Sequence, residues 1–311
     1  MYLGHIWQSL AQAATPGASK RINPDSPLAQ YCGLNGVLKP TFFTITDQEP
    51  KQLPDLKVLK SIKASRGDGS WISGLELLDE EFLKEFDYLC SELVRAASFA
   101  IDESNGLELQ KRAFEEWLEF FKRDRSFSEE IARGLFGELK FMQESRIEGE
   151  LWGEILNSWM GPFGGHQDFV FSGFKAREIK TLQPSSTEIV IASEHQLDFL
   201  GPLYLVLYRL QELGTSHKGE SLVDVVKDIE LELTSAERAD FRRGLAAVGF
   251  DPANKIANDA KYVIGEKRIY EVLGEDFPRI RGTKVPHGVR RVQYRIDLAS
   301  LSGFEASNFE D

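Results

Sequence analysis

The sequence predicts a mixed α/β fold of the α+β type, because strand-like and helical patterns occupy separate blocks of its 311 residues. Short β-branched or alternating runs lie between 41 and 78 and again between 168 and 193. Between these blocks, large apolar side chains recur at helical spacing. A further block begins near 216 with two helical patterns and ends with strand-like ones, which indicates a separate carboxy-terminal module.

Length and composition are those of a globular protein with about two domains. Hydrophobic residues make up 42% and charged residues 28% of the chain. The longest nearly apolar run, 199–208, is about half a membrane span and contains Gly201 and Pro202. Cys32 and Cys90 form neither a disulfide framework nor a zinc motif, and no export signal is apparent. We therefore expect a cytoplasmic protein without a membrane segment.

The amino-terminal region, 1–110, is expected to begin with a small β element. Runs at 41–46, 56–64 and 71–78 have strand-like composition, and Arg66-Gly-Asp-Gly69 is a turn signal between the last two. Aromatic and aliphatic stripes at helical spacing follow this element, and we expect them to be core.

A third helix is expected to begin near Ser126 or Ser128. Its apolar stripe comprises Ile131, Leu135 and Met142. Glu138 shares that face, since it follows Ile131 by seven residues and Leu135 by three. A buried carboxylate is costly unless it has a cation, a metal or a proton, so Glu138 is a candidate site residue.

The segment from Asp168 to Lys180 is expected to form a β-hairpin that pairs two carboxylates. If the loop is Ser172-Gly173-Phe174, an odd length, Asp168 falls directly opposite Glu178, with Cβ atoms about 4.5–5.5 Å apart. A two-residue loop would place them on opposite faces unless a bulge restored the register. Lys180 shares the face of Glu178 because strand side chains alternate.

Paired carboxylates beside a lysine are suited to metal-assisted phosphate chemistry. Two like charges so close are disfavoured without a cation, and Mg²⁺ accepts one or two carboxylates together with water and phosphate oxygens. Lys180 could stabilise the charge on the phosphate or orient the attacking water. The alternative is an exposed strand with an ordinary Glu-x-Lys ion pair.

Several short motifs accompany this hairpin in a fixed order. They are Gly134-Leu-Phe-Gly-Glu138-Leu, Trp159-Met-Gly-Pro162, Asp168-Phe, Glu178-Ile-Lys180-Thr and Gln196-Leu. With them, the chain resembles the PD-(D/E)XK phosphodiesterase superfamily. More narrowly, it is similar to a group of bacterial PD-(D/E)XK proteins found beside DNA-modification and phage-defence genes. That closer resemblance extends through Phe277-Pro-Arg-Ile280 and Tyr294-Arg-Ile-Asp-Leu298 and covers most of the chain.

The resemblance implies a restriction-endonuclease-like core at 111–215, with a mixed sheet flanked by helices. It implies that Asp168 and Glu178 are metal ligands and that Lys180 assists the attacking water. It also implies that Glu138 supports the metal or its water, with Mg²⁺ as the cofactor and Mn²⁺ as a substitute. Gln167 stands where the superfamily usually has proline, a departure that leaves ligation possible.

The remaining region, 216–311, is expected to be a helix-helix-strand module, with a winged-helix-like DNA contact as one reading. Its stretch 267–295 carries eight basic and three acidic residues within a chain whose net charge is −12. The basic residues are Lys267, Arg268, Arg279, Arg281, Lys284, Arg290, Arg291 and Arg295. They would suit phosphate contacts, whereas the alternative is a solvated edge or a protein-binding face.

The sequence thus predicts a Mg²⁺-dependent endonuclease that acts on DNA in restriction or phage defence, together with other proteins of such a system. A homodimer would supply the two active sites that double-strand cleavage needs. One alternative is a catalytically silent DNA-binding or assembly subunit, which the acidic net charge favours. Another is a structural scaffold, in which Asp168 and Glu178 would lie far apart and Glu138 would point to solvent.

Overall fold

The structure is a computed structural model that describes residues 3–13, 15–24, 26–122, 127–213, 218–286, 289 and 292–309. The chain divides into two compact units, residues 1–123 and 124–311. None of the helices in the described ranges is both long and apolar enough to cross a bilayer.

The amino-terminal unit contains a five-stranded antiparallel sheet in the order β1-β2-β3-β5-β4. Its strands are β1 (Ser19–Arg21), β2 (Ala29–Leu34), β3 (Pro40–Thr46), β4 (Leu59–Ser65) and β5 (Trp71–Leu77). The turn between β4 and β5 is closed by a hydrogen bond from the Arg66 N–H to the Ser70 carbonyl, and Gly69 adopts a φ of 88°. The expected β element is therefore present.

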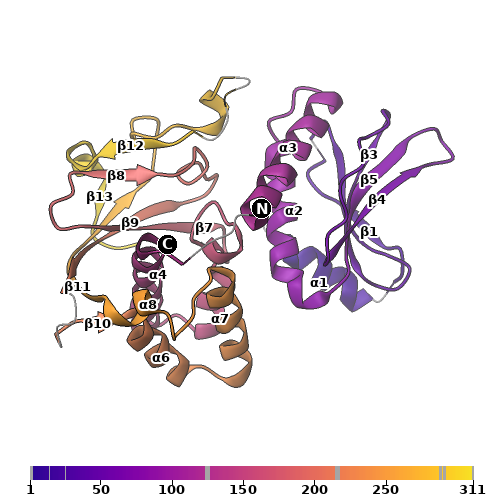
Figure 1. Ribbon diagram of the computed structural model, residues 1–311. Coiled ribbons are helices and arrows are strands. Elements are labelled where there is room, and N and C mark those ends of the chain that lie inside the picture. The colour runs from indigo at the N-terminus through magenta and orange to yellow at the C-terminus, as the bar shows by residue number, and fades with distance from the viewer. Residues whose placement is uncertain are drawn as a thin grey trace. The chain divides into compact units, whose positions relative to one another are not determined.

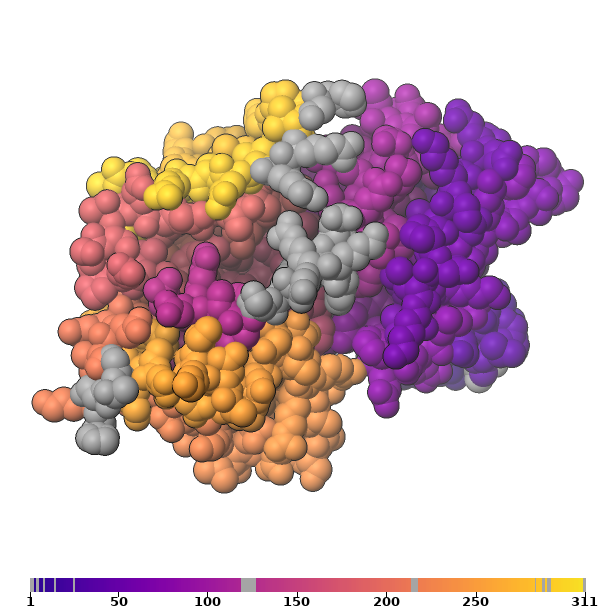
Figure 2. Space-filling view, in the orientation of Figure 1, coloured from indigo at the N-terminus to yellow at the C-terminus, as the bar shows by residue number. Residues whose placement is uncertain are grey.

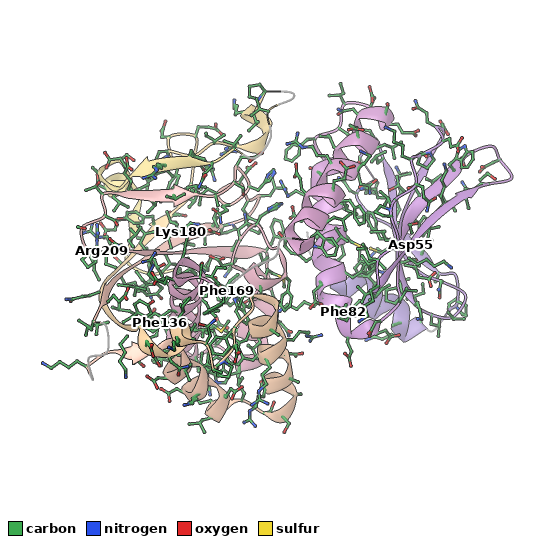
Figure 3. The ribbon with its side chains drawn as sticks, viewed as in Figure 1. Asp55, Phe82, Phe136, Phe169, Lys180 and Arg209 are labelled. Carbon is green, nitrogen blue, oxygen red and sulfur yellow. The ribbon has the colours of Figure 1, made fainter. Side chains whose placement is uncertain are left out.

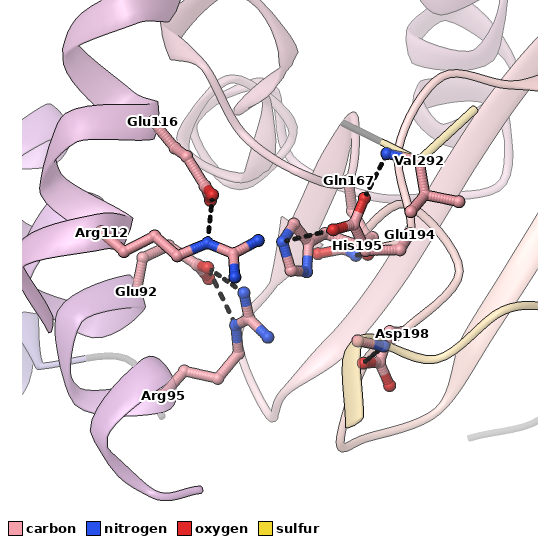
Figure 4. Close-up of polar contacts among 10 residues, drawn as sticks. Glu92, Arg95, Arg112, Glu116, Gln167, Glu194, His195, Asp198 and Val292 are labelled. Carbon is pink, nitrogen blue, oxygen red and sulfur yellow. Dashed lines mark hydrogen bonds and ion pairs between the residues drawn. The ribbon is translucent and has the colours of Figure 1, made fainter. Parts of the chain in front are cut away.

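Three helices, α1 (Gly4–Ala13), α2 (Leu83–Ala97) and α3 (Glu103–Lys122), accompany this sheet, and the short 3₁₀ turn η1 (Glu80–Phe82) precedes α2 (Figure 1). Phe86, Leu89 and Leu93 of α2 are buried against the sheet, as their helical spacing predicts. Ion pairs within the helices, Glu92 with Arg95 and Arg112 with Glu116, lie on their partly exposed sides (Figure 4).

The carboxy-terminal unit is built on a mixed sheet in the order β10-β11-β9-β7-β6, with β13 paired to β11. Its strands are β6 (Phe169–Phe171), β7 (Lys175–Leu182), β9 (Leu203–Glu212), β10 (Glu220–Ser221), β11 (Lys261–Glu271) and β13 (Glu305–Ala306). Strands β7 and β9 are parallel, whereas the other pairs are antiparallel. The mixed α/β fold expected from the sequence is confirmed.

A separate two-stranded ribbon pairs β8 (Glu188–Ile191) with β12 (Tyr294–Asp297). In the space-filling view, the yellow carboxy-terminal residues lie directly against the salmon-coloured region that contains β8 (Figure 2). The 3₁₀ segments η3 (Gly282–Lys284) and η4 (Leu298–Phe304) flank β12 along the chain.

Helices cover the sheet of this unit. They are α4 (Glu129–Ile147), α5 (Trp152–Ser158), α6 (Leu222–Glu232), α7 (Ser235–Ala247) and α8 (Lys255–Asp259). The short 3₁₀ turn η2 (Gly161–Phe163) follows α5. The Ser128 hydroxyl caps α4 by accepting from the Ile131 N–H, whereas Ser126, the other expected start, lies outside the described residues. Phe136 of α4 and Phe169 of β6 belong to the core between helices and sheet (Figure 3).

The sequence predicts a separate helix-helix-strand module at 216–311, with a winged-helix-like contact as one reading, whereas the structure joins this range to the sheet and core of 124–213. Strand β11 pairs with β9 from Tyr262 opposite Glu212 to Glu271 opposite Tyr204, and α6 packs against α4. The physical reason is that β9 is apolar and buried along nearly its whole length, so it needs neighbours on both edges. Residues 216–311 supply one of these neighbours and share the core of 124–213. The expected boundary at 110 likewise falls inside α3.

Candidate metal centre

The β6–β7 hairpin has the register that a three-residue loop predicts. Phe169 lies opposite Arg177, and Phe171 lies opposite Lys175. The intervening turn includes Gly173 and Phe174, whose φ angles of 82° and 64° are in the left-handed region. Continued by one residue, the same register sets Asp168 against Glu178.

Asp168 is fixed at the start of β6 through both its side chain and its backbone. Its Oδ2 accepts a hydrogen bond of 2.7 Å from the N–H of Ile179 on β7. Its carbonyl accepts from the N–H groups of Met160 and Gly161, at 2.8 and 3.1 Å. Burial raises the pKa of Asp168, although Lys180 and the Ile179 N–H act in the opposite direction. The carboxylate therefore has one defined position.

Glu178 is 0% exposed, and neither of its carboxylate oxygens accepts a hydrogen bond of ordinary geometry from the described residues. Its charge partner is the Nζ of Lys180, 2.8 Å from Oε1. Burial, and then the neighbouring Asp168, raises the pKa of Glu178 to about 8. Such a carboxyl group gains from any cation that can reach it.

Lys180, labelled in Figure 3, is held between two partners, Glu178 and Gln196. Besides the ion pair with Glu178, its Nζ donates to Oε1 of Gln196 at 3.1 Å. That amide oxygen also accepts from the Ala192 N–H at 2.8 Å, which fixes its orientation. Burial alone would lower the pKa of Lys180, but the charges of Glu178 and Asp168 outweigh burial and raise it. The ammonium group is therefore charged.

Glu138 reaches the same region from α4. Its Oε2 accepts a hydrogen bond of 2.6 Å from the indole N–H of Trp159. Burial, followed by the charge of Asp168, raises the pKa of Glu138 well above its ordinary value. A Cβ atom placed on Gly161 would lie 3.3 Å from this Oε2 and 3.1 Å from Oδ1 of Asp168. The four predicted site residues are thus brought together.

Sequence reasoning named Gln167 and Gln196 but missed the contacts by which they support these four residues. Gln167 is buried, and its Nε2 donates to the carbonyls of His195 and Gln196 at 2.7 and 3.2 Å. His195 and Gln196 lie in the turn 194–197, here called the supporting turn, in which Glu194 accepts from the Val292 N–H (Figure 4). The sequence signal for the contacts of Gln167 was its place in the position where the superfamily usually has proline, because glutamine adds a donor that proline lacks.

The donor set fits a hard divalent cation, although it is not a preformed cage. Within the described ranges, no three His, Cys, Asp or Glu side chains are arranged as a metal site. Oδ2 of Asp168 faces the Ile179 N–H and Oε1 of Glu178 faces Lys180, so an ion would compete with these partners. Carboxylate oxygens are nonetheless the ligands that Mg²⁺ and Mn²⁺ take, and Glu178 is buried with the Lys180 ammonium as its charge partner.

The basic stretch 267–295 is largely engaged within the protein. Lys267 pairs with Glu144, Arg268 with Glu266, Arg281 with Glu275, and Arg295 with Glu188. Arg279 donates to the carbonyls of Leu197, Val272 and Gly274. Lys284 is exposed, and Arg290 and Arg291 lie outside the described residues. Most of the described basic residues of this stretch therefore have a partner within the protein.

In the comparison with family models, a model matches residues 3–299. None of the curated proteins and none of the solved structures matches the chain. The matched residues include the hairpin, α4 and the supporting turn described above, as well as the whole amino-terminal sheet. The chain therefore belongs to the family described as "Putative PD-(D/E)XK family member, (DUF4420)".

Proposed function

We propose that the protein is a metal-dependent endonuclease that hydrolyses phosphodiester bonds in DNA, in restriction or phage defence. The observation that carries the proposal is the hairpin register, which opposes Asp168 to Glu178 and leaves Lys180 beside them. Membership of a PD-(D/E)XK family suggests a nuclease-like hydrolase. The substrate and the biological setting go beyond that membership.

In this proposal Asp168 and Glu178 hold the cation, and Glu138 supports it or its water. A bound Mg²⁺ or Mn²⁺ would supply Lewis-acid polarisation of the phosphate and a water of lowered pKa. The chain's own contribution is placement: the hairpin fixes Asp168, and α4 brings in Glu138. Each carboxyl must be deprotonated to bind the ion, and the ion favours that deprotonation.

Lys180 would act on the phosphate or on the attacking water. Its ammonium group carries three N–H donors, of which Glu178 and Gln196 engage two. The remaining donor can stabilise charge that develops on a phosphate oxygen or orient the water. When a cation binds Glu178, the hydrogen bond to Gln196 would keep the ammonium group at this position.

Plasmid cleavage tests the proposal directly. We expect purified protein to cut plasmid DNA with Mg²⁺ or Mn²⁺, and Asp168→Ala and Lys180→Ala to lower the rate by about 100-fold or more. Asp228→Ala and Lys227→Ala, on the exposed side of α6, are matched controls that should cut at the wild-type rate. Cleavage that survives both site substitutions would refute the assignment.

A catalytically silent DNA-binding or assembly subunit is the second candidate. The net charge of −12 and the engaged basic residues favour it, because an independent nuclease benefits from a basic surface. Calorimetry with Mn²⁺ separates the two, since the silent subunit would bind no divalent ion. The scaffold alternative requires separated carboxylates and a solvent-directed Glu138, and the contacts of Asp168 and Glu138 do not match it.

A further inference from the structure

The segment Trp159–Gly161 contacts both Glu138 and Asp168. The indole of Trp159 is 1% exposed, and its N–H donates to Oε2 of Glu138 at 2.6 Å. An indole N–H is a donor only, so an acceptor such as a carboxylate oxygen is the partner it requires. An isolated bridge between Trp159 and Phe169 joins the same residue to β6. Trp159 therefore connects the helix that carries Glu138 to the hairpin that carries Asp168.

The position of the indole is fixed from the far side by α7. A Cβ atom on Gly244 would lie 2.3 Å from Cζ3 of Trp159 and 2.9 Å from its Cε3. Phe241, one turn earlier on α7, has its ring centroid 6.0 Å from that of Trp159. Because the helix backbone lies directly against the ring, the indole has little freedom to turn away from Glu138.

The two residues after Trp159 hold the backbone of Asp168. The N–H groups of Met160 and Gly161 both donate to the Asp168 carbonyl, at 2.8 and 3.1 Å. Pro162 and Phe163 continue this segment as a buried turn, so the two N–H groups do not shift independently of the core. The segment thus sets the start of β6 as well as the orientation of Glu138.

Because Gly161 has no side chain, it leaves a space beside one carboxylate oxygen of Asp168 and one of Glu138. A Cβ atom there would lie 3.1 Å from Oδ1 of Asp168 and 3.3 Å from Oε2 of Glu138. The φ of Gly161 is not in the left-handed region, so backbone conformation does not require a glycine at this position. A methyl group at this point would occupy volume beside both oxygens, where an ion bound to both of them must come.

We propose that the Trp159–Gly161 segment is the positioning element of the metal centre. Trp159 holds Glu138, the following N–H groups hold Asp168, and the missing side chain of Gly161 leaves open the space beside Oδ1 of Asp168 and Oε2 of Glu138 that a divalent cation or its water would enter. This inference rests on the proposed function and assigns roles to residues that do not act as ligands themselves.

Two substitutions test the two parts of the inference by Mn²⁺ calorimetry on the full chain. Trp159→Phe keeps the ring and removes the N–H, and we expect Mn²⁺ affinity to fall about 10-fold, as is typical when a ligand loses its orienting hydrogen bond. Gly161→Ala adds one methyl group between the carboxylates, and we expect a fall of about 100-fold. Thermal unfolding without metal verifies that each variant is folded.

Matched controls lie in the same unit. Trp152→Phe also removes an indole N–H that donates to a glutamate, since Trp152 Nε1 is 3.1 Å from Oε2 of Glu232. Gly134→Ala also adds a methyl group to glycine, at a place with nothing within 4 Å. Both controls should keep Mn²⁺ affinity within about twofold of the wild type, in contrast to the roughly 10-fold loss expected for a supporting contact.

A double-mutant cycle separates positioning from a general structural role. If Trp159 acts through Glu138, Trp159→Phe should have no further effect on Mn²⁺ affinity in a Glu138→Ala background. Additive losses would overturn the role of Trp159, and wild-type affinity in Gly161→Ala would overturn the role of Gly161. Should Trp159→Phe fail to fold, Gly161→Ala still tests whether the space beside Gly161 is needed for Mn²⁺ binding. A wild-type protein that binds no Mn²⁺ would instead overturn the proposed function.

Discussion

At the scale of single residues, the buried Glu178 is the most consequential side chain. It is fully enclosed and has the Lys180 ammonium as its charge partner. Removing an ionised carboxylate from water costs more than one ion pair returns, which is why its pKa is raised to about 8. The metal-free protein therefore pays a stability cost for carrying its candidate ligand.

This cost predicts how stability without metal depends on pH. Between the ordinary pKa of 4.5 and the folded value of about 8, the folded chain binds a proton at Glu178 that the unfolded chain does not. The free energy of unfolding should therefore fall as pH rises through this window, by about 1.4 kcal/mol per pH unit from this group. Glu138 and Asp168, whose pKa values are also raised, act in the same direction.

Chemical denaturation in EDTA between pH 5 and 8 measures this dependence. Glu178→Gln should flatten the profile, because the amide does not titrate, whereas Glu188→Gln on the exposed ribbon should leave it unchanged. A wild-type profile that rises with pH, or a Glu178→Gln profile with the wild-type slope, would contradict the assignment.

At the scale of elements, the β6–β7 hairpin decides whether a centre exists. Strand side chains alternate, so a register change of one residue moves one carboxylate to the other face. Deletion of Ser172 should therefore abolish detectable Mn²⁺ binding while the circular dichroism of the folded chain is kept. Gly173→Ala, which keeps the loop length, should cost about 1 kcal/mol because of the left-handed φ of 82° but leave Mn²⁺ affinity unchanged. Equal affinity in the deletion variant would show that the register is not what builds the centre.

Elements whose pattern is local were predictable from the sequence. The helical spacing around Leu135 placed Glu138 on the buried face of α4, and alternation placed Lys180 beside Glu178. The contact of Trp159 with Glu138 joins residues 21 positions apart, and the link from Gln167 to the His195 carbonyl spans 28. Neither follows from any local period, because both depend on how α4 and the supporting turn pack on the sheet.

The arrangement of residues 216–311 could not be predicted for the same reason, since it too depends on packing between distant segments. Its helices and strands were expected, but the pairing of β11 with β9 was not. An apolar strand such as β9 requires neighbours without specifying which segment supplies them. The basic residues near β11 and β12 were visible as a cluster, whereas two of their acidic partners, Glu144 for Lys267 and Glu188 for Arg295, come from distant positions.

At the scale of the whole molecule, the net charge of −12 limits the electrostatic contribution to DNA affinity. With most described basic residues of 267–295 paired internally, few cations are left to replace counterions on phosphate. Under the proposed function, this balance favours recruitment to DNA by another protein, and a bound cation would supply part of the attraction to the DNA backbone.

Fluorescence anisotropy on a labelled duplex checks this expectation. Lys180→Ala protein, chosen because it should not cut, is expected to bind with a dissociation constant of about micromolar or weaker without metal, and more tightly with Mg²⁺. Nanomolar binding without metal, with a steep loss as salt rises, would instead indicate a basic surface on the protein itself.

Whether Asp168, Glu178 and Glu138 hold a divalent cation is answered by a crystal structure soaked with Mn²⁺, with anomalous diffraction to locate the metal. We expect an anomalous peak beside Gly161, with carboxylate oxygens of Asp168 and Glu178 as ligands and Glu138 bound to the ion or its water. Saturating Mn²⁺ with no peak there, or a peak whose ligands exclude both Asp168 and Glu178, would contradict it.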